Sequence, residues 1–151
     1  MVTVYRTFDP FLIKYLYGQE GMYDMVVDDN EPTYSQMTPN MSPADMVWLV
    51  AMVGTEIAGF MRADRVNNST YSVHVMFFKK FRGAVAREAG KLAKDFMRQM
   101  CNCTCLVAIM PCNLPYVKQF CDDNEFKIVG QLTQSYKKNG RYYDQFIMEA
   151  H

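Results

Sequence analysis

A short basic turn in the middle of the chain, Lys79-Lys80-Phe81-Arg82-Gly83, has residues suited to binding an anion. It follows a β-rich segment and precedes a segment with helical periodicity. Unpaired N–H groups at a helix start, aided by the helix dipole, attract phosphate oxygens. Gly83 would let the backbone approach such a group, and Arg82 or Lys80 would add charge. An ordinary solvated connection is the alternative interpretation of the turn alone.

The five cysteines are the other reactive side chains, and three of them lie in Cys101-Asn102-Cys103-Thr104-Cys105. Their odd number, in a chain without a secretory pattern, argues against a disulfide framework. A zinc site usually needs paired ligands at Cys-x-x-Cys spacing. Cys112, Cys121, His74 and His151 could contribute ligands, but their spacing is poor. We therefore expect reduced, mostly buried thiols and no metal site.

The composition is that of one ordinary globular domain, and it argues against several classes of function. The chain has 151 residues, of which 50% are hydrophobic and 21% charged, enough for one core but not comfortably for two. Its 16 basic and 16 acidic residues cancel, which argues against a nucleic-acid binder or a membrane-surface protein. No apolar run reaches the roughly 18 residues needed to span a bilayer. We expect a single domain over residues 1–151 that works in a cytoplasm.

Patterns of strands and helices place the basic turn at a definite point in the chain. Asp9-Pro10 is typical of a helix start, and Asn139-Gly140 is the strongest hairpin turn. The expected strands are Val2–Thr7, Val47–Val53, Glu56–Arg65, Thr70–Phe78, Thr104–Met110, Phe126–Tyr136 and Arg141–Glu149. The expected helices are Pro10–Tyr17, Met22–Val27, one from Gly83 to about Met100, and one from Pro111-Cys112-Asn113 to about Asn124. This order predicts a mixed α/β sheet.

The helix after the turn is expected to bury one face. Its apolar residues at helical spacing are Val85, Ala86, Ala89, Leu92, Ala93, Phe96, Met97 and Met100. The basic residues Arg87, Lys91, Lys94 and Arg98 fall on the opposite face, which we expect to be solvated.

Four motifs, taken in their order and spacing, resemble the GNAT superfamily of acetyl-CoA-dependent N-acetyltransferases, and above all its small phage-encoded GNAT-like proteins. The motifs are Val73-His74, Phe81-Arg82-Gly83, Pro111-Cys112-Asn113 and the hairpin run from Lys138 to Gln145. The resemblance covers Val47 to Glu149. It implies an α/β (α+β) fold with N-terminal helices, a mixed, mostly antiparallel sheet, a central β-α-β-α unit and a C-terminal hairpin.

The resemblance also implies a cofactor site. Acetyl-CoA, the expected co-substrate, would lie where the strand at Thr70–Phe78 diverges from the strand at Thr104–Met110. Main-chain groups around Met76 and Phe77 would hold its pantetheine arm and polarise the thioester carbonyl, and Asn113 would help to hold the arm. The pyrophosphate would bind to the backbone amides of Arg82, Gly83, Ala84, Val85 and Ala86. The β-branched side chain of Val85 would crowd it, because active family members usually have further glycines there.

The implied catalytic residues are less regular. His74 is the candidate general base, because an imidazole suits proton removal at neutral pH; a structural histidine is the alternative. Cys121 stands where many family members have a tyrosine that protonates the leaving thiolate. A cysteine packed beside Phe120 is the alternative there, and Tyr116, one turn earlier, could substitute as the acid.

Two functions remain open at this point. The first is an N-acetyltransferase that acts on an amine of a small molecule or protein by direct attack. The second is a catalytically degenerate GNAT-fold protein with a structural or interaction role, such as a phage virion or morphogenesis component or an inhibitor of a host protein. The acids Glu20, Asp24, Asp28, Asp29 and Glu31 would suit a cationic amine. A homodimer also stays open.

Overall fold

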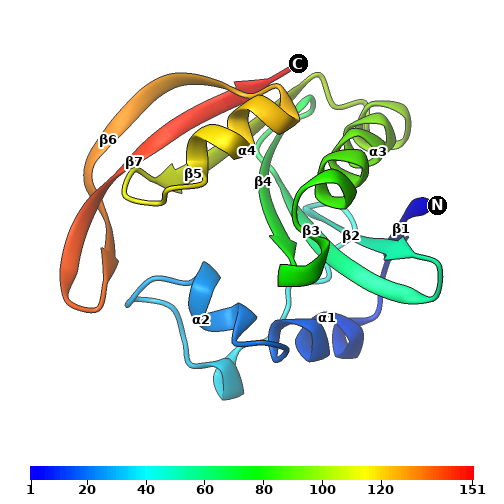
Figure 1. Cartoon of the computed structure of the whole chain (residues 1–151), viewed down its shortest axis with the longest axis horizontal. Coiled ribbons are helices and arrows are strands. Elements are labelled where there is room, and N and C mark those ends of the chain that lie inside the picture. The colour runs from blue at the N-terminus through cyan, green and yellow to red at the C-terminus, as the bar shows by residue number, and fades with distance from the viewer.

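Seven strands form one sheet in the order β1-β2-β3-β4-β5-β7-β6 (Figure 1). The computed structural model describes residues 1–151. Its strands are β1 (Val2–Thr7), β2 (Met46–Val53), β3 (Glu56–Arg65), β4 (Thr70–Phe77), β5 (Cys105–Pro111), β6 (Lys127–Lys138) and β7 (Arg141–Ala150). Its helices are α1 (Pro10–Tyr17), α2 (Met22–Val26), α3 (Ala84–Cys101) and α4 (Val117–Asn124), with short 3-10 turns η1 (Tyr34–Gln36) and η2 (Lys79–Phe81). The expected mixed sheet is confirmed.

The one parallel pair of neighbouring strands, β4 and β5, is also the shortest pairing in the sheet. It consists of Thr70 with Cys105, Tyr71 with Leu106 and Ser72 with Val107. All other neighbours are antiparallel. Figure 1 shows β4 and β5 together near the C-terminus of the chain and apart at their far ends. The sheet is therefore split between β4 and β5.

The helices cover the two faces of the sheet unequally. On one face, α3 packs over the β1–β4 half, and α4 lies over β5 and β7 (Figure 1). Buried residues of both helices, such as Met97 and Val117, share one core cluster with strand residues. On the other face, α1 and α2 pack against β2, β3 and β4 through a second cluster that includes Tyr17, Trp48 and Phe60. The β5–β7 half of that second face carries no helix.

Local signals in the sequence set several of these elements. The Asp9 carboxylate accepts hydrogen bonds from the amides of Phe11 (2.9 Å) and Leu12 (3.3 Å), so it caps α1 as expected. Asn139 and Gly140 both have positive φ, 51° and 77°, as a two-residue hairpin turn requires. The Asp29 carboxylate accepts from both of their amides at 2.9 Å. These bonds lower the pKa of Asp29 and tie the segment after α2 to the hairpin.

Two expectations about helices are wrong. The helix before the last hairpin begins at Val117, not at Pro111-Cys112-Asn113. Pro111 ends β5, and a turn with bonds from Leu114 to Pro111 and from Val117 to Leu114 precedes the helix. Lys94 is not on a solvated face, since it is only 6% exposed. Its ammonium group donates to the Asn124 carbonyl (3.0 Å) and the Glu125 carboxylate (2.6 Å) at the end of α4.

All five cysteines are free thiols. Cys103 and Cys121 are buried and the other three are half-buried. Burial raises the pKa of each thiol. None of the helices combines the length and apolar character needed to cross a membrane.

Tyr17→Phe tests the buried hydroxyl between the two layers. Burial raises the pKa of Tyr17 to about 12, although the nearby Arg62 charge lowers it. A raised pKa stabilises the fold below the unfolded value of 10.0, and this stability is lost as pH rises through the folded value. Between about pH 9 and about pH 11 the variant should therefore lose roughly 1 kcal/mol less free energy of unfolding than wild type. Urea unfolding at the two pH values measures this; equal losses would contradict it.

Lys94→Met tests the contact between α3 and α4. Methionine replaces the stem but removes the donors to Asn124 and Glu125, so the Asn124 carbonyl loses its partner. We expect a loss of about 1–3 kcal/mol in the free energy of unfolding. Glu125→Gln is the matched comparison, because the Glu125 side chain is 74% exposed and its pair should contribute little. Urea unfolding of both variants should show the larger loss for Lys94→Met; similar losses would mean that the carbonyl contact is unimportant.

Candidate functional site

The split between β4 and β5 leaves main-chain groups of β4 without a neighbouring strand. Just after β4, the amide of Phe78 donates to the Ala58 carbonyl of β3 at 3.0 Å. Because alternate residues of a strand turn their backbone groups to opposite sides, those of Val75 and Phe77 face the split. Met76 faces β3 instead, where its carbonyl leaves no room for a side chain at Gly59. Of the two expected residues, Phe77 therefore presents its main chain to the split, as Val75 does, whereas Met76 does not.

The start of α3 lies at the wide end of the split. Gly83 has φ 94° and ψ −125°, a conformation suited to glycine, and no side chain caps the helix. The first amide that bonds back into the helix start is that of Arg87, to the Gly83 carbonyl at 3.0 Å. The amides of Ala84, Val85 and Ala86 precede that bond, so they are free to bind an anion.

The side chains around this turn differ from the expectation in detail. Val85 is partly buried and packs against the core cluster that contains Phe77 and Ala89. Arg82 donates from Nε to the Phe77 carbonyl at 3.2 Å, which ties the turn to the end of β4. Lys80 instead pairs with the Glu56 carboxylate in the β2–β3 hairpin. Arg82 is therefore the cation nearest in sequence to the free amides that is not paired with an acid.

Asn113 lies across the split from α3. It is exposed in the turn that follows β5. The neighbouring Cys112 amide donates to the Asp144 carbonyl of β7 at 2.8 Å. Since β4 and β5 are parallel, the C-terminal ends of both strands lie at the wide end of the split. α3 begins beyond the end of β4, and Asn113 lies beyond the end of β5, on the other side of the split.

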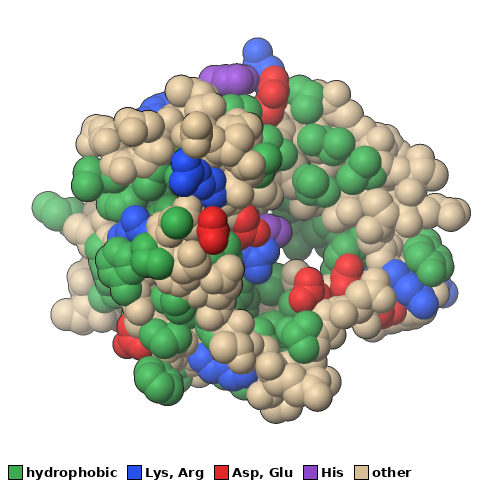
Figure 2. All heavy atoms as spheres, turned by 180° about the vertical axis from the view of Figure 1, so that it is seen from behind, with side chains coloured by type: hydrophobic (Ala, Val, Ile, Leu, Met, Phe, Trp, Pro, Cys, Tyr) green, Lys and Arg blue, Asp and Glu red, His purple; other side chains and the backbone are tan.

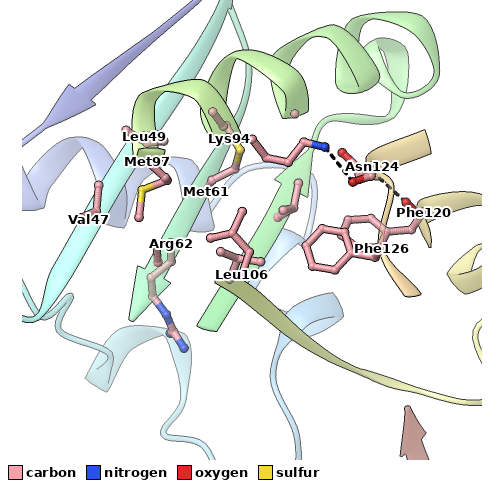
Figure 3. Close-up of a pocket in the computed structure, with 15 residues that line it drawn as sticks. Val47, Leu49, Met61, Arg62, Lys94, Met97, Leu106, Phe120, Asn124 and Phe126 are labelled. Atoms are coloured by element: carbon pink, nitrogen blue, oxygen red, sulfur yellow. Dashed lines mark hydrogen bonds between the residues drawn. The ribbon is translucent and has the colours of Figure 1, made fainter. Parts of the chain in front are cut away.

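A small apolar cavity of about 40 Å³ lies between the sheet and helices α3 and α4 (Figure 3). Hydrophobic residues make up 11 of the 15 that line it, among them Val73 and Val75 of β4. Figure 3 shows Lys94 reaching across its edge to Asn124, while the Arg62 guanidinium points away from it. The cavity adjoins the part of β4 where pairing with β5 has ended, so the space of the split continues under α3.

On the opposite face of the sheet, His74 belongs to a charged cluster with Arg62 and Asp64. His74 and Arg62 are direct cross-strand partners, and His74 Nε2 lies 3.0 Å from the Arg62 guanidinium and 3.6 Å from Asp64 Oδ2. Arg62 Nε and Asp64 Oδ1 are 2.9 Å apart. The His74 side chain is 42% exposed. Burial alone would raise the pKa of Asp64, but the contacts with His74 and Arg62 outweigh it and lower that pKa.

Two groups compete for His74 Nε2 in this cluster. Arg62 can only donate, so a hydrogen bond from Arg62 uses Nε2 as the acceptor, whereas Asp64 can only accept from that nitrogen. If Nε2 gained a proton, it would have to leave Arg62 and turn its N–H to Asp64, which already lies within reach. Sequence reasoning missed Arg62 and Asp64. The available signal was that both charges stand at alternate positions of an apolar strand. A hairpin register would place them opposite or beside His74.

Acidic side chains also lie near the face of the sheet that carries His74, which we call the open face because its β5–β7 half has no helix. Figure 2 shows this side of the molecule hollowed near its centre, with acidic side chains on both sides of the hollow. The segment after α2 is fixed beside the last hairpin, because its Val27 carbonyl accepts from the Tyr136 hydroxyl (3.1 Å) and from Lys138 Nζ (2.6 Å). Four acids around this segment are exposed: Glu20 before α2, Asp24 within it, and Asp29 and Glu31 after it.

Tyr116 and Cys121 occupy very different environments on α4. Tyr116 is the residue before the helix and is 51% exposed. It lies near Tyr136, whose pKa is raised first by burial and also by the charges around it, Tyr116 included. Cys121 faces the core, with its thiol against the Met148 sulfur at 2.9 Å. Its placement fits the packing role that the sequence left open, with Met148 as the neighbour.

Solved structures identify the fold. Spermidine N-acetyltransferase from Vibrio cholerae, in complex with CoA and spermine, matches with a TM-score of 0.78 and 15% identity over 99% of this chain and 94% of that one. Spermidine/spermine N-acetyltransferase SpeG from the same organism, in complex with manganese ions, matches with a TM-score of 0.71 and 16% identity over 99% and 91%. The expected GNAT fold is therefore confirmed. No curated protein matches the sequence of this chain.

A family model also matches most of the chain. The model, described as "Protein of unknown function (DUF2824)", matches residues 22–148, which include all elements from α2 to β6 and most of β7. The chain, a GNAT fold with a split between β4 and β5, thus belongs to the family described as protein of unknown function DUF2824.

Proposed function

We propose that this protein is an N-acetyltransferase that binds acetyl-CoA in the split and passes the acetyl group to a cationic amine by direct attack. The observation that carries the proposal is that two sets of free main-chain groups lie together at one end of the sheet. The main chain of β4 is released from pairing after Ser72, and the free amides of α3 begin just beyond the end of that strand. The fold shared with CoA-bound spermidine N-acetyltransferase supports it.

The pyrophosphate, the pantetheine arm and the thioester of acetyl-CoA each have a matching group in or beside the split. The amides of Ala84, Val85 and Ala86 suit the pyrophosphate, with Arg82 as the neighbouring cation. The main chain of Phe77 and of Val75 suits the pantetheine amides, and an N–H there would polarise the thioester carbonyl. Asn113 would hold the arm from the other side of the split. Met76 has no direct part in this arrangement.

His74 is the proposed proton acceptor. In the resting cluster the Arg62 guanidinium lies 3.0 Å from its Nε2. Removal of a proton from the attacking amine would need Arg62 to release Nε2. Asp64 would then accept the new N–H and stabilise the imidazolium. Tyr116 is the better candidate to protonate the leaving thiolate, because it is exposed, whereas the Cys121 thiol is turned into the core.

The acceptor is proposed to be an amine with more than one positive charge. The exposed acids Glu20, Asp24 and Glu31 would attract such a molecule to the open face. The similar enzyme that binds spermine supports this class of substrate.

A protein with this fold but without the reaction is the second candidate. It is favoured by one observation, that the Arg62 guanidinium lies 3.0 Å from His74 Nε2, the nitrogen proposed to take the proton. In that case the cluster would serve to hold β3 to β4, and the split could still bind CoA. The two following experiments separate binding from turnover.

Arg82→Glu tests the anion site. Calorimetric titration of the wild-type protein with acetyl-CoA should show saturable binding, and the charge reversal should weaken it at least about tenfold, because a cation beside the pyrophosphate becomes an anion. Lys127→Glu is the matched control, since it makes the same charge change at an exposed position at the start of β6. It should change the affinity by less than about twofold in physiological salt.

The outcome that would contradict the cofactor site is also clear. No binding at millimolar acetyl-CoA, or equal weakening by both charge reversals, would remove the evidence that the α3 amides hold the pyrophosphate. A degenerate interaction protein would then be the better interpretation.

His74→Gln tests the proposed proton acceptor. Glutamine can keep a contact with Arg62 but cannot take a proton at neutral pH. We expect unchanged acetyl-CoA affinity and a fall in kcat of at least about 100-fold, measured by mass spectrometry of acetylated spermine. Ser72→Ala, two residues earlier on the same face of β4, should keep nearly full turnover. If His74→Gln keeps it as well, His74 has only a structural role.

A further inference from the structure

Three side chains that are good metal ligands meet at the end of the sheet where β4 and β5 are still paired. They are the Cys105 thiol at the start of β5, the Glu149 carboxylate of β7 and the His151 imidazole just after β7. Their ligand atoms all lie within 4.8 Å of one another. The sheet register explains the meeting, because Val107 pairs with Glu149 and Leu106 with Ala150. Cys105 and His151 are therefore the next opposite positions, and all three residues lie on one face.

The histidine is already oriented as a ligand. Its Nδ1 lies 3.2 Å from the Thr104 carbonyl oxygen. A carbonyl can only accept, so Nδ1 carries the proton, and in the neutral ring the lone pair is on Nε2. Nε2 lies 3.6 Å from Glu149 Oε1, on the side of the cluster. Metal-bound histidines commonly donate their second ring N–H to a backbone carbonyl in this way, which fixes both the tautomer and the ring.

The cluster is anchored by contacts outside the three ligands. Arg98 of α3 donates to the His151 carbonyl. The neighbouring Cys103 thiol is buried and donates to the Cys105 carbonyl at 3.3 Å, so it does not compete for a cation. A histidine–glutamate ion pair alone would account for two of the three groups, but it gives no reason for the thiol to join them.

We propose that Cys105, Glu149 and His151 bind a Zn²⁺ ion through the Cys105 sulfur, a Glu149 oxygen and His151 Nε2. One sulfur, one nitrogen and one oxygen ligand suit this borderline-soft cation, and a water molecule would complete a tetrahedron. On binding, the thiol proton passes to solvent and the sulfur coordinates as thiolate. The ion would cross-link the start of β5 to the end of β7. The site is separate from the proposed acetyl-CoA site and does not depend on it.

The motif was not visible in the sequence for a topological reason. Cys105 and the other two ligands come from distant segments that become neighbours only through the antiparallel pairing of β5 with β7. The expectation of no metal site rested on the absence of Cys-x-x-Cys spacing, which ligands from paired strands do not need.

Titration with Co²⁺ and then Zn²⁺ tests the site in the reduced, chelator-treated full chain. We expect binding of one Co²⁺ per chain, with tetrahedral visible bands and a thiolate charge-transfer band in the near ultraviolet, and displacement by Zn²⁺. Cys105→Ser should abolish the charge-transfer band. His151→Gln and Glu149→Gln should each weaken Zn²⁺ binding at least about tenfold, measured by competition with a chromophoric chelator.

Cys112→Ser is the matched control, because Cys112 is also half-buried but lies at the far end of β5. It should leave the spectrum and the Zn²⁺ affinity as in wild type. Glu149 and His151 are partly exposed, so their variants keep the core intact, and circular dichroism verifies this. The proposal would be overturned by an absence of saturable binding, by a charge-transfer band that survives Cys105→Ser, or by wild-type affinity in both His151→Gln and Glu149→Gln.

Discussion

The early end of pairing between β4 and β5 is the constraint on which the rest of the site depends. Main-chain groups that face a neighbouring strand need hydrogen-bond partners, and β4 loses its partner strand after Ser72. β5 cannot move back to supply it, because its other edge is paired with β7 from Leu106 to Pro111, the end of the strand. The free edge of β4 is thus built into the sheet, and water or a ligand must satisfy it.

The two halves of the sheet are connected through the contact between helices α3 and α4. α3 belongs to the β1–β4 half and α4 to the β5–β7 half, and they touch where Gly90 lies against the Asn124 side chain. Lys94 then bonds the end of α4 through the Asn124 carbonyl. Burial of a lysine is costly unless its donors are bonded, and here a carbonyl and the Glu125 carboxylate take two of the three. A close helix contact and one buried cation therefore join the two halves of the molecule.

Elements that depend on local interactions could be predicted from the sequence. Side-chain roles that depend on residues distant in the chain could not. The Asp9 cap and the Asn139-Gly140 turn need only their own segments, so α1 and the last hairpin were predicted closely. Lys94 has the helical position of a solvated residue, and only the end of α4 gives it a buried role. Arg62 and Asp64 were likewise overlooked, since a cluster across two strands requires the register of β3 with β4. The same register decides that the main chain of Val75, and not that of Met76, faces the split.

The split also brings groups on opposite faces of the sheet within reach of one another, as the proposed reaction requires. The α3 amides and the apolar cavity lie on the face covered by α3 and α4, whereas His74 points to the face of α1 and α2. In an unbroken sheet these faces would be separated by paired backbone. Here Val75, whose main chain borders the split, follows His74 directly in β4. A thioester bound along that edge would stand within one residue of the proposed base, so an amine from the acidic face could reach it without crossing the sheet.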